Sequence, residues 1–299
     1  MTEHVIAVMG ATGNTGRKIA EALLQAGEKV RALGRSPARL ADLERAGAEV
    51  LTGDVADATF LARAFRGTTA AYTLLPTDQR SPDYAARQRQ EGEAIVQAVR
   101  ESDVRYVVAL SSLGADLADG TGVLVGLHEQ EERLKRLEGT NVLLLRPVSF
   151  FENVYGQLDL IQQQGVMADS VAPDLAAPMI AARDVADVAT GALAARDWHG
   201  VVVRELLGQR DLTHRQVARI LGERIGKPDL QYVQLSYDAM ATSLVQAGMS
   251  ESFANLYVEM TRAFNEGTVG AGIPRTAETT TPTAFEAFAD ELASAYRAA

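Results

Sequence analysis

The sequence predicts an α/β fold in which a parallel sheet carries helices on both faces and a smaller, mostly helical lobe follows. Three observations support this fold class. Short apolar segments alternate with amphipathic helical segments over the first 150 residues. That alternation breaks after Arg146-Pro147, and the remaining chain is mainly helical in pattern. Repeated strand–helix units imply a parallel sheet joined by right-handed crossovers.

Each element of the first half has a local signal. The apolar run at 5–9 is typical of a strand buried on both faces. Ile19 and Leu23 then recur at helical spacing, with Gly27 placed as a C-terminal cap. Ser36 and Pro37 suit the N-cap and first position of the next helix. Further strands are expected at 29–33, 49–51, 70–75, 104–110 and 142–145. The helix that begins at Pro37 is expected to end near 47, and further helices are expected around 60–65, 84–101 and 127–137.

The second half is expected to complete the sheet and to add a lobe over the strand ends. A helix at 183–195 and a strand at 200–207 would return to the sheet. The predicted organisation is therefore a sheet domain of residues 1–150, completed by about 183–207, and a substrate-binding lobe of 151–182 and 208–299. Within the lobe, helices are expected at 213–225, with Thr213 as N-cap, over much of 236–266, and after the threonine-rich stretch 276–283.

Composition narrows the functional classes. The chain has 299 residues, of which 47% are hydrophobic, so a sizeable core can form. A formal charge of -10 argues against nucleic-acid binding, which needs a concentrated basic face. The absence of cysteine excludes disulfides and thiolate chemistry. No apolar run approaches the ~18 residues of a membrane span, and no signal peptide precedes the first strand. We therefore expect a cytoplasmic protein without nucleic-acid or membrane partners.

A glycine-rich turn follows the first strand in the segment VIAVMGATGNTGR, residues 5–17. Gly10, Gly13 and Gly16 lie between the apolar run and the first helix. Such a turn lets a dinucleotide diphosphate approach the backbone amides and the positive end of the helix dipole. The pattern predicts a Rossmann-type nucleotide site, and a tight strand-to-helix turn without ligand is the alternative.

The end of the second strand indicates which dinucleotide is preferred. NAD sites usually carry an acidic residue there, whereas this chain has Gly34 followed by Arg35. A guanidinium can donate two hydrogen bonds to a ribose 2′-phosphate, so the sequence favours NADP, with NADPH preferred over NADH. Alternatively, Arg35 is a solvated residue at the helix start. Asp54 and Val55, after the third strand, suit an adenine contact, although Asp54 equally suits a turn.

The order of motifs resembles a known family. GATGNTGR, VRALGRSP, GDV, LSSLGA at 110–115, LRPVSFFEN at 145–153 and RDVADVA at 183–189 follow one another along the chain. This series is similar to the NmrA-like branch of the atypical short-chain dehydrogenase/reductase superfamily. The resemblance implies a Rossmann domain, a smaller C-terminal lobe and a cleft between them. It also implies either an NAD(P)H:quinone reductase or a redox-sensing regulator that binds cofactor without turnover.

The same resemblance implies a set of cofactor contacts. Together with Gly13 of the glycine pattern, it places Gly10, Thr12, Asn14, Thr15 and Gly16 around the diphosphate, Arg35 at the ribose phosphate, and Asp54 and Val55 at adenine. It places Leu74, Leu75 and Pro76 beside the cofactor, and Ser111 and Ser112 at the nicotinamide.

The usual catalytic pair of short-chain dehydrogenases is missing. None of the four lysines has a tyrosine four positions before it, so YxxxK is absent. The helix expected to carry that pair instead has His128 and Glu132, four residues apart on one face. These resemble an HxxxE found in the NmrA-like branch. A histidine oriented by a carboxylate can protonate a reduced acceptor, and a solvated surface pair is the alternative.

The sequence also suggests substrate contacts and excludes other chemistries. Phe150, Phe151 and Asn153 follow the sixth strand and are expected to line the substrate pocket. The phenylalanines also fit a plain core, and Asn153 also fits a helix cap. No HExxH pattern occurs, so no metal site is expected. The serine nucleophile motif GxSxG and the phosphate-loop motif GxxxxGK[ST] are also absent.

Together these patterns predict an NAD(P)H-dependent oxidoreductase that passes hydride to a small electrophilic acceptor such as a quinone. The fold orients the cofactor, and the cofactor carries the chemistry. A non-catalytic NADP(H)-sensing regulator of the NmrA type is the rival hypothesis. The sequence leaves the oligomeric state open.

Overall fold

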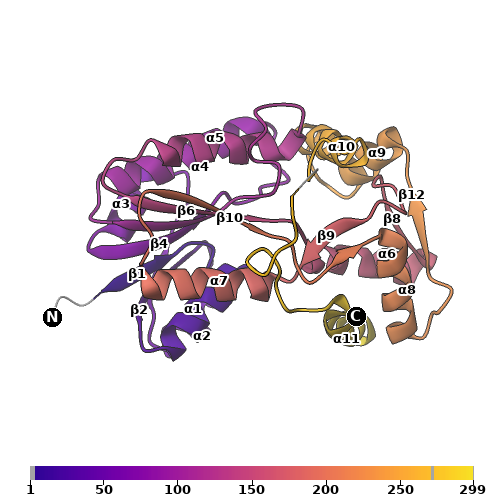
Figure 1. Ribbon diagram of the computed structural model, residues 1–299, viewed down its shortest axis with the longest axis horizontal. Helices are drawn as coiled ribbons and strands as arrows, with labels where there is room; N and C mark the ends of the chain where they lie inside the picture. Colours follow the sequence, from indigo (N-terminus) through magenta and orange to yellow (C-terminus); the bar gives the residue numbers. More distant parts are fainter. Residues whose placement is uncertain (1–3, 271–272, 299) are drawn as a thin grey trace.

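The computed structural model describes residues 4–270 and 273–298 and contains a central seven-stranded sheet (Figure 1). Every pair of neighbouring strands in this sheet is parallel, in the order β10-β6-β5-β4-β1-β2-β3. The strands are β1 (Val5–Val8), β2 (Lys29–Gly34), β3 (Glu49–Thr52), β4 (Thr68–Leu74), β5 (Tyr106–Leu110), β6 (Asn141–Pro147) and β10 (Val201–Leu206). The predicted doubly wound α/β fold is therefore confirmed.

Helices cover both faces of the sheet, as a parallel sheet requires. One face packs against α3 (Ala58–Phe65), α4 (Tyr84–Arg100) and α5 (Val125–Lys135) through a core that includes Phe60 and Ile95. The other face packs against α1 (Gly16–Gln25), α2 (Pro37–Arg45) and α7 (Ala182–Ala195) through Ile19, Leu40 and Val185. Figure 1 shows the two helical layers above and below the sheet.

Some helix ends differ from the predictions. Ser36 does precede α2, but its side chain makes no capping hydrogen bond. Asp57 and Asp83 do cap α3 and α4, because their carboxylates accept from amides in the first turn. Thr213 forms a capping box with Gln216 at the start of α8 (His214–Ile225), as its position predicts.

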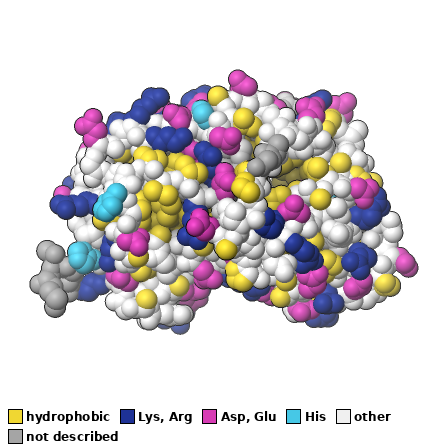
Figure 2. Space-filling model, in the orientation of Figure 1, with side chains coloured by type: hydrophobic (Ala, Val, Ile, Leu, Met, Phe, Trp, Pro, Cys, Tyr) yellow, Lys and Arg dark blue, Asp and Glu magenta, His cyan; other side chains and the backbone are white. Residues whose placement is uncertain are grey.

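β10 returns to the sheet and forms one of its edges. Its valines Val201, Val202 and Val203 are 43%, 37% and 42% exposed. In Figure 2 hydrophobic side chains gather over the part of the surface where Figure 1 places β6 and β10. No helix in the described part of the chain combines the length and apolarity needed to cross a bilayer.

The remaining elements form a second region beyond the carboxyl ends of the strands (Figure 1). A three-stranded sheet of β7, β9 and β11 and a two-stranded sheet of β8 and β12 pack with helices around Phe151, Phe285 and Phe288. Its elements are β7 (Ser149–Phe150), a 3-10 helix (Phe151–Gln157), α6 (Leu158–Gln164), β8 (Val166–Asp169), β9 (Ala177–Ile180), β11 (Asp211–Leu212), α8, β12 (Gln231–Gln234), α9 (Tyr237–Gln246), α10 (Glu251–Asn265) and α11 (Phe285–Ala298). The sequence does not predict these two- to four-residue strands, because such short segments show no period.

Candidate functional site

A first cavity of 370 Å³ lies at the carboxyl ends of the strands, where the strand order reverses between β1 and β4. This crevice is where open parallel sheets bind ligands. Eleven of the predicted cofactor residues line it: Gly10, Thr12, Gly13, Asn14, Thr15, Arg35, Asp54, Val55, Leu74, Leu75 and Pro76.

The glycine turn brings α1 close to β1. Gly10 has a φ of +61°, a conformation that favours glycine. A Cβ on Gly16 would lie 2.4 Å from the carbonyl oxygen of Gly10 and 2.6 Å from that of Met9. Gly16 therefore allows helix and strand to pack tightly. The resemblance implies that Gly16 lies at the diphosphate, but Gly16 is not among the residues that line the cavity.

Backbone amides at the start of α1 are available to a ligand. The amides of Asn14 and Thr15 donate no hydrogen bond to another described residue, as expected for the first turn of a helix. The side chain of Thr15 is fixed instead, because the buried Tyr72 hydroxyl donates to its Oγ1 at 2.9 Å. The turn thus combines free N–H donors with the positive end of a helix dipole, which together suit an anion.

Arginines surround the end of β2. Arg35 is exposed at the cavity and makes no hydrogen bond or salt bridge with the described residues. Arg39 also lines the cavity, and its Nη2 donates to the carbonyl oxygen of Thr12 at 2.9 Å. Arg31 is committed elsewhere, because it bonds Glu49 and the carbonyl oxygens of Ala64 and Arg66. A phosphate at this end of the cavity would meet a guanidinium without an ion-pair partner.

A charged network lies at the end of the cavity that was predicted to hold adenine. Asp54 Oδ1 accepts from Arg87 Nη2 at 2.5 Å and from the Ala56 amide at 3.0 Å. Desolvation opposes ionisation of Asp54, but these hydrogen bonds outweigh it and lower its pKa. Arg87 also pairs with Glu91 at 2.8 Å, and burial raises the pKa of Glu91 to about 7. No sequence signal points to Arg87 and Glu91, because only the fold brings α4 to the end of β3.

Ser111 and Ser112 line neither this cavity nor a second one, whose walls include Leu113 and Val148. The hydroxyl of Ser111 donates to Glu131 Oε1 at 2.6 Å, inside the protein. Arg146 donates to both oxygens of the same carboxylate, at 2.8 and 2.7 Å. Ser112 Oγ donates to the carbonyl oxygen of Leu113 at 3.0 Å. Both hydroxyls are therefore engaged in local structure, and their contact with the nicotinamide, which the resemblance implies, stays a prediction.

His128 and Glu132 also lie outside both cavities. His128 Nδ1 is 3.0 Å from the carbonyl oxygen of Ala115, so this nitrogen carries the proton. Glu132 is 40% exposed at its side chain and pairs with Lys135 at 2.9 Å. The Lys135 hydrogen bond is the main cause of the lowered pKa of Glu132. The structure does not bring this pair to a position facing either cavity.

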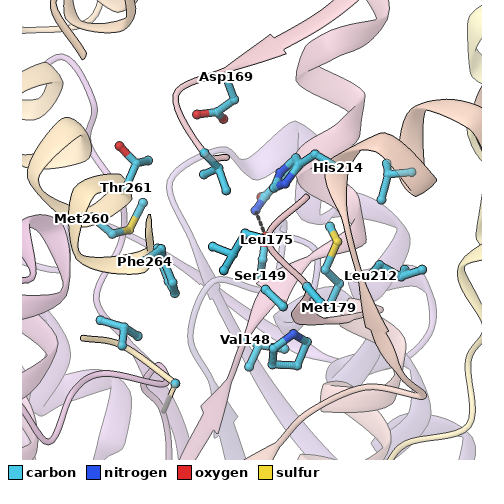
Figure 3. Close-up of a pocket in the computed structure, with 18 of the residues that line it drawn as sticks. Val148, Ser149, Asp169, Leu175, Met179, Leu212, His214, Met260, Thr261 and Phe264 are labelled. Atoms are coloured by element: carbon cyan, nitrogen blue, oxygen red, sulfur yellow. Dashed lines mark hydrogen bonds between the residues drawn. The ribbon is translucent and has the colours of Figure 1, made fainter. Parts of the chain in front are cut away.

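The second cavity, of 320 Å³, lies on the side of the second region, and Figure 3 shows residues that line it. Ser149 lines this cavity, whereas the next residue of β7, Phe150, lines the first one. The predicted substrate residues therefore separate. Asn153 lines the second cavity, and Phe151 is buried against Phe285 with ring centroids 5.0 Å apart.

The second cavity has mainly apolar walls with a few polar groups. Leu113, Val148, Met179, Leu212, Met260 and Phe264 contribute apolar side chains. Tyr257 donates to Asp169 Oδ2 at 2.7 Å, and Tyr232 donates to the carbonyl oxygen of Val171 at 2.7 Å. The His214 ring lies 4.9 Å from that of Tyr232, and burial lowers the pKa of His214. No local sequence pattern points to these four polar residues as parts of one site.

Comparison with known proteins decides the family, because the model of the NmrA-like family matches residues 2–289. The chain belongs to the NmrA-like family. One relative, a (4-alkanoyl-5-oxo-2,5-dihydrofuran-3-yl)methyl phosphate reductase of Streptomyces griseus, is 29% identical over 92% of this chain and 93% of its own.

Two solved structures of similar fold differ in the roles that their names state. An NADPH-dependent quinone oxidoreductase of Escherichia coli, solved with NADPH, has a TM-score of 0.77 and 23% identity over 97% of this chain and 99% of its own. NmrA, a negative transcriptional regulator solved with NADP, has a TM-score of 0.70 and 15% identity over 100% of this chain and 92% of its own. These likenesses establish a shared fold with both an enzyme and a regulator.

Proposed function

We propose that this NmrA-like protein is an NADPH-dependent reductase that passes hydride to a small electrophilic acceptor such as a quinone. The observation that carries the proposal is a pair of cavities lined by consecutive residues of β7: Ser149 lines the second and Phe150 lines the first. One cavity suits a dinucleotide, and the other suits an apolar molecule of moderate size. Two reactants held side by side gain the advantage of proximity.

The residues of the first cavity fit a nicotinamide dinucleotide. The free amides of Asn14 and Thr15 would hold the diphosphate, and the close approach at Gly16 aims the N-terminus of α1 at it. Arg35 would pair with a 2′-phosphate. Asp54, fixed by Arg87, and Val55 would bound the adenine. When bound, the nicotinamide supplies the hydride.

The second cavity would hold the acceptor with its reactive carbon toward Ser149, which precedes Phe150 in β7, and Phe150 lines the first cavity. Hydride addition to a quinone gives an aromatic hydroquinone anion, which solvent protonates readily. A dedicated acid is therefore not required. Because His128 and Glu132 face neither cavity, we assign them no proton transfer in this reaction.

Anaerobic stopped-flow oxidation of NADPH with a panel of quinones tests the proposal. We expect turnover above the uncatalysed rate, with NADPH binding measured separately by calorimetry. Tight NADPH binding without oxidation across the panel would contradict the reductase and favour the rival.

The rival proposal is a regulator whose cleft closes around NADP(H). Its support is the described lining of both cavities, which lacks the tyrosine–lysine pair of carbonyl reductases, together with the similar fold of NmrA. Such a protein needs the glycine turn but no acceptor. If no quinone of the panel binds in the second cavity, that result would favour the regulator.

A further inference from the structure

The second cavity has an unbalanced charge. Among its described lining residues, Asp169 is the only aspartate or glutamate, and there is no lysine or arginine. Positions 271 and 272, outside the described residues, are Ala and Gly and add no charge. The cavity therefore presents one carboxylate within apolar walls (Figure 3).

Hydrogen bonds hold this carboxylate in place but do not neutralise it. Asp169 is the last residue of β8, and its Oδ1 accepts from the Ser170 amide at 2.6 Å. Its Oδ2 accepts from the hydroxyl of Tyr257, whose pKa burial raises, so the tyrosine stays a neutral donor. In the described part of the chain, no lysine or arginine forms a salt bridge with Asp169.

His214 does not supply the missing positive charge. Burial is the main influence on its pKa and lowers it, although Asp169 acts in the opposite direction. His214 is also the first residue of α8, where the helix dipole disfavours a cation. Its ring is therefore uncharged at neutral pH, when Asp169 is the one charged group of the described lining.

We propose that the second cavity selects its ligand by charge, admitting aromatic acceptors that carry no anionic group and favouring those with a cationic substituent, with Asp169 as the specificity-determining residue. In naming the ligand an acceptor, the inference rests on the proposed reductase function. A phosphate, carboxylate or sulfonate would lose its hydration and meet a carboxylate without a compensating cation. The Streptomyces griseus relative is named for a phosphate ester. The cavity of this chain is not built for such a substrate.

Three anthraquinones of the same ring system test the inference by calorimetry at pH 7. They carry a 2-sulfonate, a 2-sulfonamide or a 2-aminomethyl group, which are anionic, neutral and cationic. We expect the sulfonamide to bind about tenfold more tightly than the sulfonate, and the aminomethyl compound to bind at least as tightly as the sulfonamide. The inference is overturned if the sulfonate binds as tightly as the sulfonamide, or if none of the three binds.

Variants of near-identical shape assign the effect to one residue. Asp169→Asn should reduce the sulfonamide-to-sulfonate ratio to about threefold or less. Asp174→Asn is the matched control, because Asp174 is exposed, pairs with Arg215 outside the cavity and changes the net charge equally. A folded Asp169→Asn protein that keeps the original ratio contradicts the assignment.

His214→Lys provides a second, independent variant if Asp169→Asn does not fold. A lysine here places a cation in the same cavity, and we expect sulfonate affinity to rise by about tenfold. An unchanged sulfonate affinity in that variant would also count against charge selection. All binding is measured without nicotinamide nucleotide, so loss of NADPH binding or of quinone turnover would overturn the reductase proposal and leave these ratios standing.

Discussion

The two cavities differ in how the chain builds them. The first is lined mainly by short segments that follow strands β1 to β4, so each contact is close in sequence to a recognisable strand end. The second combines residues as distant as Ser149, Asp169, His214 and Met260. A ligand site at strand ends can thus be located from local patterns, whereas a site made by packing distant segments depends on the tertiary fold.

The largest expected effect lies at the buried ion pair that joins α5 to β6. Glu131→Gln would remove the carboxylate that pairs with the buried Arg146 guanidinium through two hydrogen bonds and leave Asp116, at 3.8 Å, as its only ion-pair partner among the described residues, so it should lower the free energy of unfolding by about 3–5 kcal/mol. Denaturant titration measures this change. Glu132→Gln, one residue later but exposed and paired only with Lys135, should stay within about 0.5 kcal/mol. Equal effects of the two variants would show that the buried pair does not stabilise the packing of α5 on β6.

The next largest effect is expected at the glycine turn between β1 and α1. A methyl group on Gly16 would press against the backbone of Met9 and Gly10, so Gly16→Ala should cost about 1–3 kcal/mol and weaken NADPH binding. Gly191→Ala is the control within α7, because beyond its chain neighbours and the adjacent helix backbone nothing lies within 4 Å of the added Cβ. That variant should gain about 0.5–1 kcal/mol from helix propensity. A neutral Gly16→Ala would refute the tight approach of α1 to β1.

Arg35→Ala should weaken NADPH binding by about ten- to a hundredfold and NADH binding far less, since a charged hydrogen bond is worth roughly 1.5–3 kcal/mol. Calorimetry with both nucleotides measures the two losses. Arg45→Ala, on the exposed side of α2, should change neither affinity. Equal losses for NADPH and NADH would remove the 2′-phosphate assignment.

The smallest effect is a pH dependence at Glu91. Because the folded state raises the pKa of Glu91 from 4.5 to about 7, it binds this proton more tightly than the unfolded chain does. The resulting stabilisation is complete below pH 4.5 and is lost as the pH rises through about 7. Relative to Glu91→Gln, the native protein should therefore lose about 1–2 kcal/mol between pH 5 and pH 8. A difference that does not vary with pH would contradict the raised pKa.

The sequence predicts the sheet and the position of the first cavity because their signals are local. Gly10 to Gly16 follow an apolar strand, and Arg35 follows the next one. Local signals do not predict contacts between residues that are distant in the sequence. Ser111 looks like a free hydroxyl at a strand end, but the fold places Glu131 and Arg146 against it.

Two neighbouring residues after β6 show the same limit. Phe150 and Phe151 are indistinguishable in the sequence, yet one lines the first cavity and the other enters the core with Phe285. Asp169 and Tyr257 are 88 positions apart, and no local pattern predicts their hydrogen bond. Chemistry that depends on such pairs can be read only from the folded chain.

The central claim, that hydride passes between ligands in the two cavities, is tested most directly by a variant that fills only the second. Ala176 is exposed at that cavity, so Ala176→Trp can occupy its space without disturbing the core. We predict that this variant binds NADPH with the native affinity but loses quinone-dependent NADPH oxidation. Native turnover in the filled variant, measured under the same anaerobic conditions, would contradict the claim.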